Sequence, residues 1–92
     1  MYSVYIIFSQ SGNRYYIGQT SNVDMRLSRH NAGYEKSTKP YIPWEMIFWI
    51  EKNSRSEAMV LEKKLKNLNT KDLLKFIDKF QTRTGVVRSV KI

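Results

Sequence analysis

One carboxylate occupies an unusual place in this sequence. Apolar residues recur at helical spacing between residues 58 and 68, which predicts a helix that buries one stripe. At about 100° per residue, Glu62 falls roughly 40° from Ala58, on the flank of that stripe. An ionised carboxylate is rarely placed there unless it is paired or holds a metal, and Mg²⁺ often uses only one or two carboxylates with waters and phosphate oxygens. The alternative is a structural ion pair with Lys66, four residues on, or with Arg26.

A guanidinium and an imidazole share one face of another predicted helix. Within residues 23–32, the helical phase set by Val23 places His30 about 20° from the buried direction and Arg26 at its border. Their spacing of four residues lets both side chains face the same way, as a phosphate clamp would require. The competing interpretation is that His30 is a core histidine with satisfied hydrogen bonds and Arg26 a solvated helix residue.

Two tyrosines fall on opposite arms of a hairpin predicted over residues 2–20. With its turn centred near residues 10–11, Tyr5 and Tyr16 would lie directly across from one another on one face. Gly18, two residues beyond Tyr16, would keep that face open for a backbone or a ligand. Ordinary sheet packing explains paired tyrosines equally well, and a register slip of one residue would separate them.

The elements that must position these residues follow from the hydrophobic pattern. The sequence predicts strands at 2–8, 14–20 and 44–51 and helices at about 23–32, 55–67 and 71–80. This order, ββαβαα, is typical of an α+β domain in which a three-stranded antiparallel sheet packs with helices. We expect residues 1–80 to form this single domain. The basic tail, residues 81–92, would belong to it or be flexible, with a small extra strand at Val86, Val87 and Val90.

Local signals mark the ends of the predicted helices. Ser21 or Asn22 can cap the first helix, and Gly33 would end it. Residues 54–57 have the capping-box pattern, and Thr70 is expected to cap the last helix.

Composition narrows the class of function. The 92 residues carry a formal net charge of +8, which favours a polyanionic partner such as nucleic acid. The sequence has no cysteine and one histidine, which excludes a disulfide scaffold, a thiolate metal site and a multi-histidine zinc site. No apolar run approaches the roughly 20 residues of a membrane span, and no charged leader precedes one. We therefore expect a cytoplasmic protein without a membrane partner.

Taken together, these positions resemble the signature of the GIY-YIG nuclease superfamily. The two tyrosines lie in tripeptides similar to the two that name the family, and the Arg-x-x-x-His pair and the lone Glu follow at matching spacings. The residues that carry the resemblance are Ser3-Val4-Tyr5, Tyr16-Ile17-Gly18, Arg26, His30, Ser37-Thr38-Lys39, Pro43-Trp44 and Glu62. The stretch around Thr38 is similar to that of the small stand-alone bacterial members.

The resemblance implies a role for each of five residues in phosphodiester hydrolysis. Tyr5 would take the proton of the attacking water or position it, and nearby cations would have to lower its pKa from the usual value near 10. Tyr16 would orient the water or contact the scissile phosphate. Arg26 would neutralise charge on the phosphoryl oxygens, and His30 would hydrogen-bond the phosphate or relay a proton. Glu62 would hold one divalent metal, Mg²⁺ or Mn²⁺.

Further residues are expected to contact the nucleic acid: Gly18, Thr38, Lys39 and Lys66. The sequence also departs from the family pattern. Ser3-Val4 stands where the name has Gly-Ile, and Gln19 stands where some relatives carry a Lys just after the glycine.

The function we expect is that of a metal-dependent endonuclease with low intrinsic sequence specificity. DNA is favoured over RNA as the substrate, with no small-molecule cofactor, and repair, mobile-element and defence roles all use such a module. Cutting both strands of a duplex would require a homodimer or a partner protein. The alternative is a nucleic-acid-binding module that keeps the fold but is non-catalytic or depends on a partner.

Overall fold

The sheet has three antiparallel strands, with the first strand in the centre. Strand β1 (Tyr2–Ser9) pairs on one side with β2 (Arg14–Thr20) and on the other with β3 (Glu45–Lys52). The computed structural model describes residues 1–84, with side chains through residue 80, so the extra strand expected near Val86, Val87 and Val90 lies outside the described residues.

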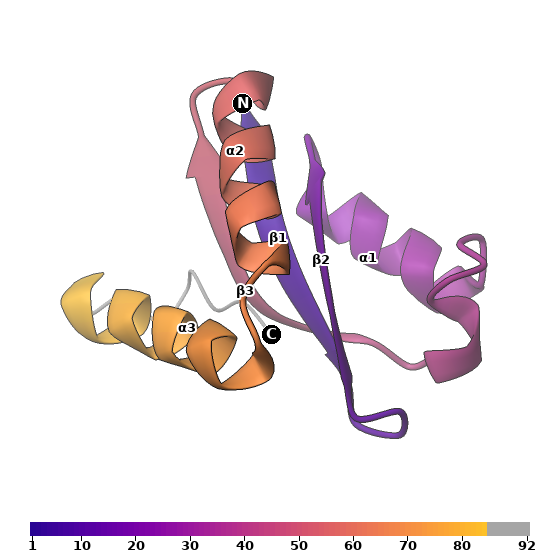
Figure 1. The fold of residues 1–92 in the computed structure, drawn as a ribbon. Helices are drawn as coiled ribbons and strands as arrows, with labels where there is room; N and C mark the ends of the chain where they lie inside the picture. The colour runs from indigo at the N-terminus through magenta and orange to yellow at the C-terminus, as the bar shows by residue number, and fades with distance from the viewer. Residues whose placement is uncertain (85–92) are drawn as a thin grey trace.

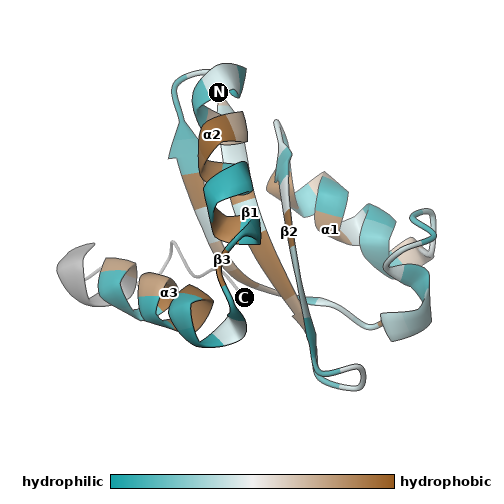
Figure 2. Cartoon of the chain, in the orientation of Figure 1, coloured by the Kyte–Doolittle hydropathy of each residue, from teal (hydrophilic) through white to brown (hydrophobic). Residues whose placement is uncertain are grey.

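Helices cover both faces of this sheet. Helices α2 (Arg55–Lys66) and α3 (Thr70–Thr84) pack on one face, and α1 (Val23–Ala32) packs on the other (Figure 1). Apolar bands on the helices and a largely apolar sheet meet between these layers (Figure 2). The α+β class and the order ββαβαα are therefore confirmed.

Strand β1 contributes to a core on each side. Val4 and Ile6 point toward α2 and α3, whereas Tyr5 and Ile7 point toward α1, and all four are fully buried. Burying each such side chain contributes about 1.5–3 kcal/mol, so this strand is a major source of stability.

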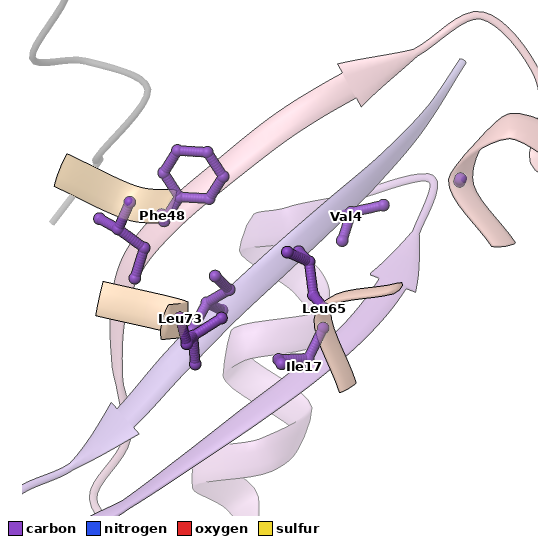
Figure 3. Packing of buried hydrophobic residues seen from close by; sticks show 8 residues of the cluster. Val4, Ile17, Phe48, Leu65 and Leu73 are labelled. Carbon is purple, nitrogen blue, oxygen red and sulfur yellow. The ribbon is translucent and has the colours of Figure 1, made fainter. Parts of the chain in front are cut away.

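The larger core joins the sheet to α2 and α3. Figure 3 shows Leu65 and Leu73, from the two helices, directed at the strands that carry Val4, Ile17 and Phe48. This packing holds α2, and with it Glu62, against the sheet.

The hairpin register differs from the prediction by two residues. Tyr5 pairs with Gly18 and Ile7 pairs with Tyr16, so the two tyrosines are diagonal neighbours and not directly opposite. The turn lies between the paired residues Ser9 and Arg14, one residue later than predicted, because the Ser9 hydroxyl accepts from Gly12 N and donates to the carbonyl of Tyr41. Side chains of a strand alternate between the two faces of the sheet, so a register shift of two residues leaves each side chain on the same face. Both tyrosine rings therefore stay on the α1 face.

Local capping signals explain the ends of α1 and α2. The Asn22 side chain accepts from Met25 N, and Gly33 ends α1 with φ of 85°, a left-handed conformation that glycine adopts readily. Ser54 caps α2 by accepting from Glu57 N.

The start and length of α3 differ from the prediction. Asn69, and not Thr70, accepts the capping hydrogen bond from Asp72 N, and the helix continues to Thr84. The loop before β3 also contains a short 3₁₀ turn, η1 (Lys39–Tyr41). Among the helices of residues 1–84, none combines the length and the hydropathy that a membrane crossing requires.

Candidate active site

Four of the five predicted catalytic side chains line one open pocket. The pocket lies at the edge strand β2, between α1 and α2, and Tyr5, Tyr16, Arg26 and Glu62 contribute to its wall. They come from β1, β2, α1 and α2 respectively, so the fold brings together residues up to 57 positions apart in the chain. His30 lies outside the wall, buried behind Tyr5.

Gly18 makes room for the ring of Tyr5. The two residues are paired across β1 and β2, and a Cβ atom at Gly18 would lie 2.6 Å from the Tyr5 hydroxyl oxygen. No side chain fits there while Tyr5 keeps its position. The expectation that Gly18 leaves this face open for a ligand needs correction, because Tyr5 itself fills most of that space, although Gly18 still borders the pocket.

Behind Tyr5 lies a line of buried polar groups. The Tyr5 hydroxyl is 2.9 Å from His30 Nε2, and His30 Nδ1 is 2.9 Å from the Thr38 hydroxyl. His30 and Thr38 are each 1% exposed. Tyr5 is equally buried but contributes to the pocket wall, whereas His30 and Thr38 do not. Direct contact of His30 with a phosphate, and of Thr38 with a substrate strand, is therefore not available in this conformation. Both side chains support Tyr5 from within.

The loop that carries Thr38 is fixed by further hydrogen bonds. The indole N–H of Trp44 donates to the Thr38 carbonyl at 2.8 Å, and the Thr38 hydroxyl donates to the carbonyl of Glu35 at 3.4 Å. Lys39, the next residue, is exposed and is not part of the pocket wall.

Burial keeps both Tyr5 and His30 neutral. Desolvation raises the pKa of Tyr5 far above its ordinary value, with Tyr16 adding to the effect and the nearby Arg26 opposing it. Sequence analysis expected nearby cations to lower this pKa, but burial has the larger effect. Desolvation likewise lowers the pKa of His30 from 6.5; Arg26 and Arg29 act in the same direction, and Glu35 opposes them.

Both carboxylate oxygens of Glu62 have partners. Lys66 Nζ lies 2.7 Å from Oε2, and Gln19 Nε2 donates to Oε1 at 3.0 Å. The ion pair with Lys66 considered from the sequence is thus present. Gln19, which sequence analysis noted only as the replacement of a Lys, contacts the predicted metal ligand directly.

The surroundings of Glu62 offer oxygen donors for a hard cation. Gln19 Oε1 is buried beside the Glu62 carboxylate without a hydrogen-bond partner among the described residues. Within residues 1–80, no group of three or more histidine, aspartate or glutamate side chains forms a ready-made metal site. Glu62 is the one carboxylate in the described pocket wall, so a bound cation would need further ligands from water and substrate.

Sequence analysis missed Arg55 and Tyr2, which also line the pocket. The Arg55 guanidinium lies 5.9 Å from the centre of the Tyr2 ring. Arg55 precedes Glu62 by seven residues, which is about two helical turns, so this spacing was the available signal. Arg55 adds a second guanidinium to the pocket beside that of Arg26.

Comparisons with known proteins agree with this geometry. The sequence model of the GIY-YIG catalytic domain matches residues 1–75. UPF0213 protein SH2523 of Staphylococcus haemolyticus is 37% identical over 76 residues, which cover 82% of this chain and 92% of that protein. The structure-specific endonuclease subunit SLX1 homolog of Brugia malayi is 42% identical over 55 residues, which cover 50% of this chain and 16% of that protein.

A solved structure supports the same assignment. The solution NMR structure of UPF0213 protein BH0048 from Bacillus halodurans superposes with a TM-score of 0.55 at 28% identity, covering 85% of this chain and 84% of that one. The family match spans the three strands, α1 and α2, and includes every residue of the pocket wall. The chain belongs to the GIY-YIG catalytic domain family.

Proposed function

We propose that this chain is a metal-dependent endonuclease that hydrolyses phosphodiester bonds of nucleic acid, with DNA favoured and little intrinsic sequence specificity. The observation that carries the proposal is the convergence of Tyr5, Tyr16, Arg26 and Glu62 on one pocket, with His30 hydrogen-bonded behind Tyr5. The net charge of +8 supplies affinity for the phosphate backbone. A cysteine-free chain with a nucleic-acid substrate suits the cytoplasm.

Tyr5 and His30 would act together on the attacking water. A neutral phenol with a raised pKa is a poor base alone, but its hydroxyl already contacts the neutral imidazole of His30. As a water O–H bond breaks, its proton passes to the Tyr5 oxygen while the Tyr5 proton passes to His30 Nε2. The oxygen of the water forms a bond to phosphorus, and the leaving oxygen departs with its electron pair and takes a proton from solvent.

The remaining pocket residues would bind and orient the phosphate. Arg26 would stabilise the charge that develops on the phosphoryl oxygens, a contribution of several kcal/mol in comparable sites. Tyr16, whose ring packs edge-on against His30 at 5.0 Å between centroids, would hold the water or a phosphate oxygen. Arg55, Lys66 and Lys39 would contact the backbone of the strand, and such contacts position a substrate without reading its sequence.

A divalent cation fits the oxygen donors beside Glu62. The Glu62 carboxylate and the amide oxygen of Gln19 would hold Mg²⁺ or Mn²⁺, and Lys66 would have to release the carboxylate. When bound, the cation would supply positive charge that polarises the phosphate and stabilises the leaving oxygen.

The ion pair and the hydrogen bond that engage the Glu62 carboxylate also favour a second candidate function. With Lys66 and Gln19 on its two oxygens, the chain could bind nucleic acid without cutting it until a partner opens the site. The Brugia malayi relative is described as a subunit, which is consistent with a partner-dependent activity or a homodimer.

Incubation of the full chain with end-labelled nucleic acids tests the proposal. The substrates are single-stranded, duplex and branched DNA and RNA, each with Mg²⁺, Mn²⁺ or EDTA. We expect cleavage that disappears in EDTA and in Glu62→Gln but persists in Glu57→Gln, a matched change at an exposed position of the same helix. Cleavage that survives in EDTA contradicts the metal mechanism, and binding without cleavage of any substrate favours the second candidate.

A further inference from the structure

The buried line Tyr5–His30–Thr38 contains three mobile protons, and their arrangement decides what Tyr5 offers to the pocket. The phenol, the neutral imidazole and the threonine hydroxyl each carry one proton. The distances of 2.9 Å on either side of the imidazole allow two opposite directions of donation. In the first direction Tyr5 donates to His30 and His30 to Thr38; in the second Thr38 donates to His30 and His30 to Tyr5.

The first direction gives every proton an acceptor. The Thr38 hydroxyl then donates to the Glu35 carbonyl at 3.4 Å and accepts from His30 Nδ1, while the Tyr5 hydroxyl donates to the unprotonated His30 Nε2. The oxygen of Tyr5 keeps its lone pairs for the side that faces Arg26, whose positive charge opposes the rise in the pKa of Tyr5 and whose guanidinium can only donate.

The second direction conflicts with Arg26. If His30 Nε2 donated to the Tyr5 oxygen, the phenol proton would have to point to the pocket side, where the guanidinium also presents protons. Arg26 cannot accept that proton. The second direction would also give up the hydrogen bond from the Thr38 hydroxyl to the Glu35 carbonyl, because that hydroxyl has only one proton, so the first direction is the stable one.

We propose that Thr38 is a positioning residue that fixes His30 as the Nδ1–H tautomer, so that Tyr5 donates to His30 and presents only an acceptor oxygen to the pocket. A neutral histidine side chain in water prefers the opposite, Nε2–H tautomer, so the protein must impose this one. The inference rests on the proposed function: the Tyr5 oxygen can take a proton from water only if its own proton can pass to an unprotonated His30 Nε2, and only the Nδ1–H tautomer leaves that nitrogen unprotonated.

The single histidine makes the test direct. In a long-range ¹H–¹⁵N correlation spectrum of the ¹⁵N-labelled full chain, His30 gives the only imidazole signals, because the sequence has one histidine. Above neutral pH we expect Nδ1 to carry the proton and Nε2 to show the shift of an unprotonated ring nitrogen. The reverse assignment, or rapid averaging of the two tautomers, overturns the proposal.

Substitutions at Thr38 separate positioning from packing. Thr38→Val keeps the shape of the side chain but removes the hydroxyl, and we expect the His30 ring to switch to the Nε2–H tautomer. Thr38→Ser keeps the hydroxyl, so His30 should retain the Nδ1–H tautomer. A Val variant that keeps the wild-type tautomer contradicts the proposal. Should the Val variant fail to fold, the spectra of the wild type and of the Ser variant still decide.

Kinetics test the consequence for the reaction. We expect Thr38→Val to lower kcat by about 10- to 100-fold with KM and nucleic-acid affinity little changed, and Thr38→Ser to recover most of the rate. The tautomer is read without any substrate. An Nδ1–H signal in a chain that cleaves nothing would therefore reject the proposed function alone, and cleavage with the opposite tautomer would reject only the role of Thr38.

Discussion

Replacement of Gly18 by alanine perturbs the site through a single contact. The new Cβ would lie 2.6 Å from the Tyr5 hydroxyl oxygen and 2.8 Å from Cζ. To restore ordinary contact at 3.4 Å, the hydroxyl end of the ring must move by about 0.8 Å, since 3.4 − 2.6 = 0.8. The ring is fully buried in a cluster with Ile7, Trp44 and Met46, so a shift of the ring disturbs this packing.

The expected cost has two parts. Overpacking of a buried site destabilises by about 1–3 kcal/mol. The displacement also lengthens the 2.9 Å hydrogen bond from Tyr5 to His30, so we expect Gly18→Ala to lose cleavage even where it remains folded. For a domain of this size, each 1 kcal/mol lowers the melting temperature by about 4–8 °C.

Denaturant unfolding in a double-mutant cycle measures this contact. Tyr5→Leu removes the hydroxyl and ring atoms that lie at 2.6, 2.8 and 3.0 Å, so the cost of Gly18→Ala should be about 0.5–2 kcal/mol smaller in the Tyr5→Leu background than in the wild type. Equal costs in the two backgrounds, or a Gly18→Ala variant with wild-type stability and cleavage, would refute the close packing of Tyr5 on Gly18.

Three further changes probe other parts of the site. Lys66→Met frees one oxygen of Glu62 and should tighten Mn²⁺ binding by about two- to five-fold in calorimetry. The control Lys63→Met should leave the affinity unchanged. Unchanged affinity in Lys66→Met would mean that the ion pair does not compete with the cation. Burial lowers the pKa of His30 below 6.5, so on acidification the unfolded chain binds a proton at this residue before the folded chain does. The contribution of neutral His30 to stability is therefore fully present above pH 6.5. It is lost as the pH falls through the lower pKa of the folded state. Urea unfolding at pH 5 and 7.5 should show this loss in the wild type and a smaller one in His30→Gln. Arg26→Lys keeps the charge but removes the planar set of donors and should lower the single-turnover rate about 100-fold, and a Lys variant of wild-type rate would show that charge alone suffices.

Features determined by nearby residues could be predicted from the sequence. The bounds of α1 follow from a capping Asn22 and a terminating Gly33, and both act within one turn of the helix. The helical phase that set Glu62 apart as anomalous also depends only on its own helix. These signals were enough to identify the strands and the helices, whereas Tyr2 and Arg55 in the pocket wall were missed.

Features determined by distant residues could not be predicted. The hairpin register depends on the Ser9 hydroxyl reaching the carbonyl of Tyr41, 32 residues away, and no local pattern reports that contact. The Gln19 amide meets Glu62 across 43 residues for the same reason. Thr38 was expected to touch the substrate, but the fold turns its side chain inward to His30.

The central claim is that Tyr5 takes part in the chemistry of phosphodiester cleavage, and single-turnover cleavage by Tyr5→Phe tests it most directly. The measurement uses enzyme in excess over labelled DNA with Mn²⁺, with affinity measured separately in Ca²⁺ and folding checked by the amide NMR spectrum. We predict a rate at least about 100-fold below that of the wild type, with affinity and fold retained, because the variant lacks the hydroxyl that accepts the proton of the water. A Tyr5→Phe variant that is folded and cleaves at the wild-type rate would contradict the account.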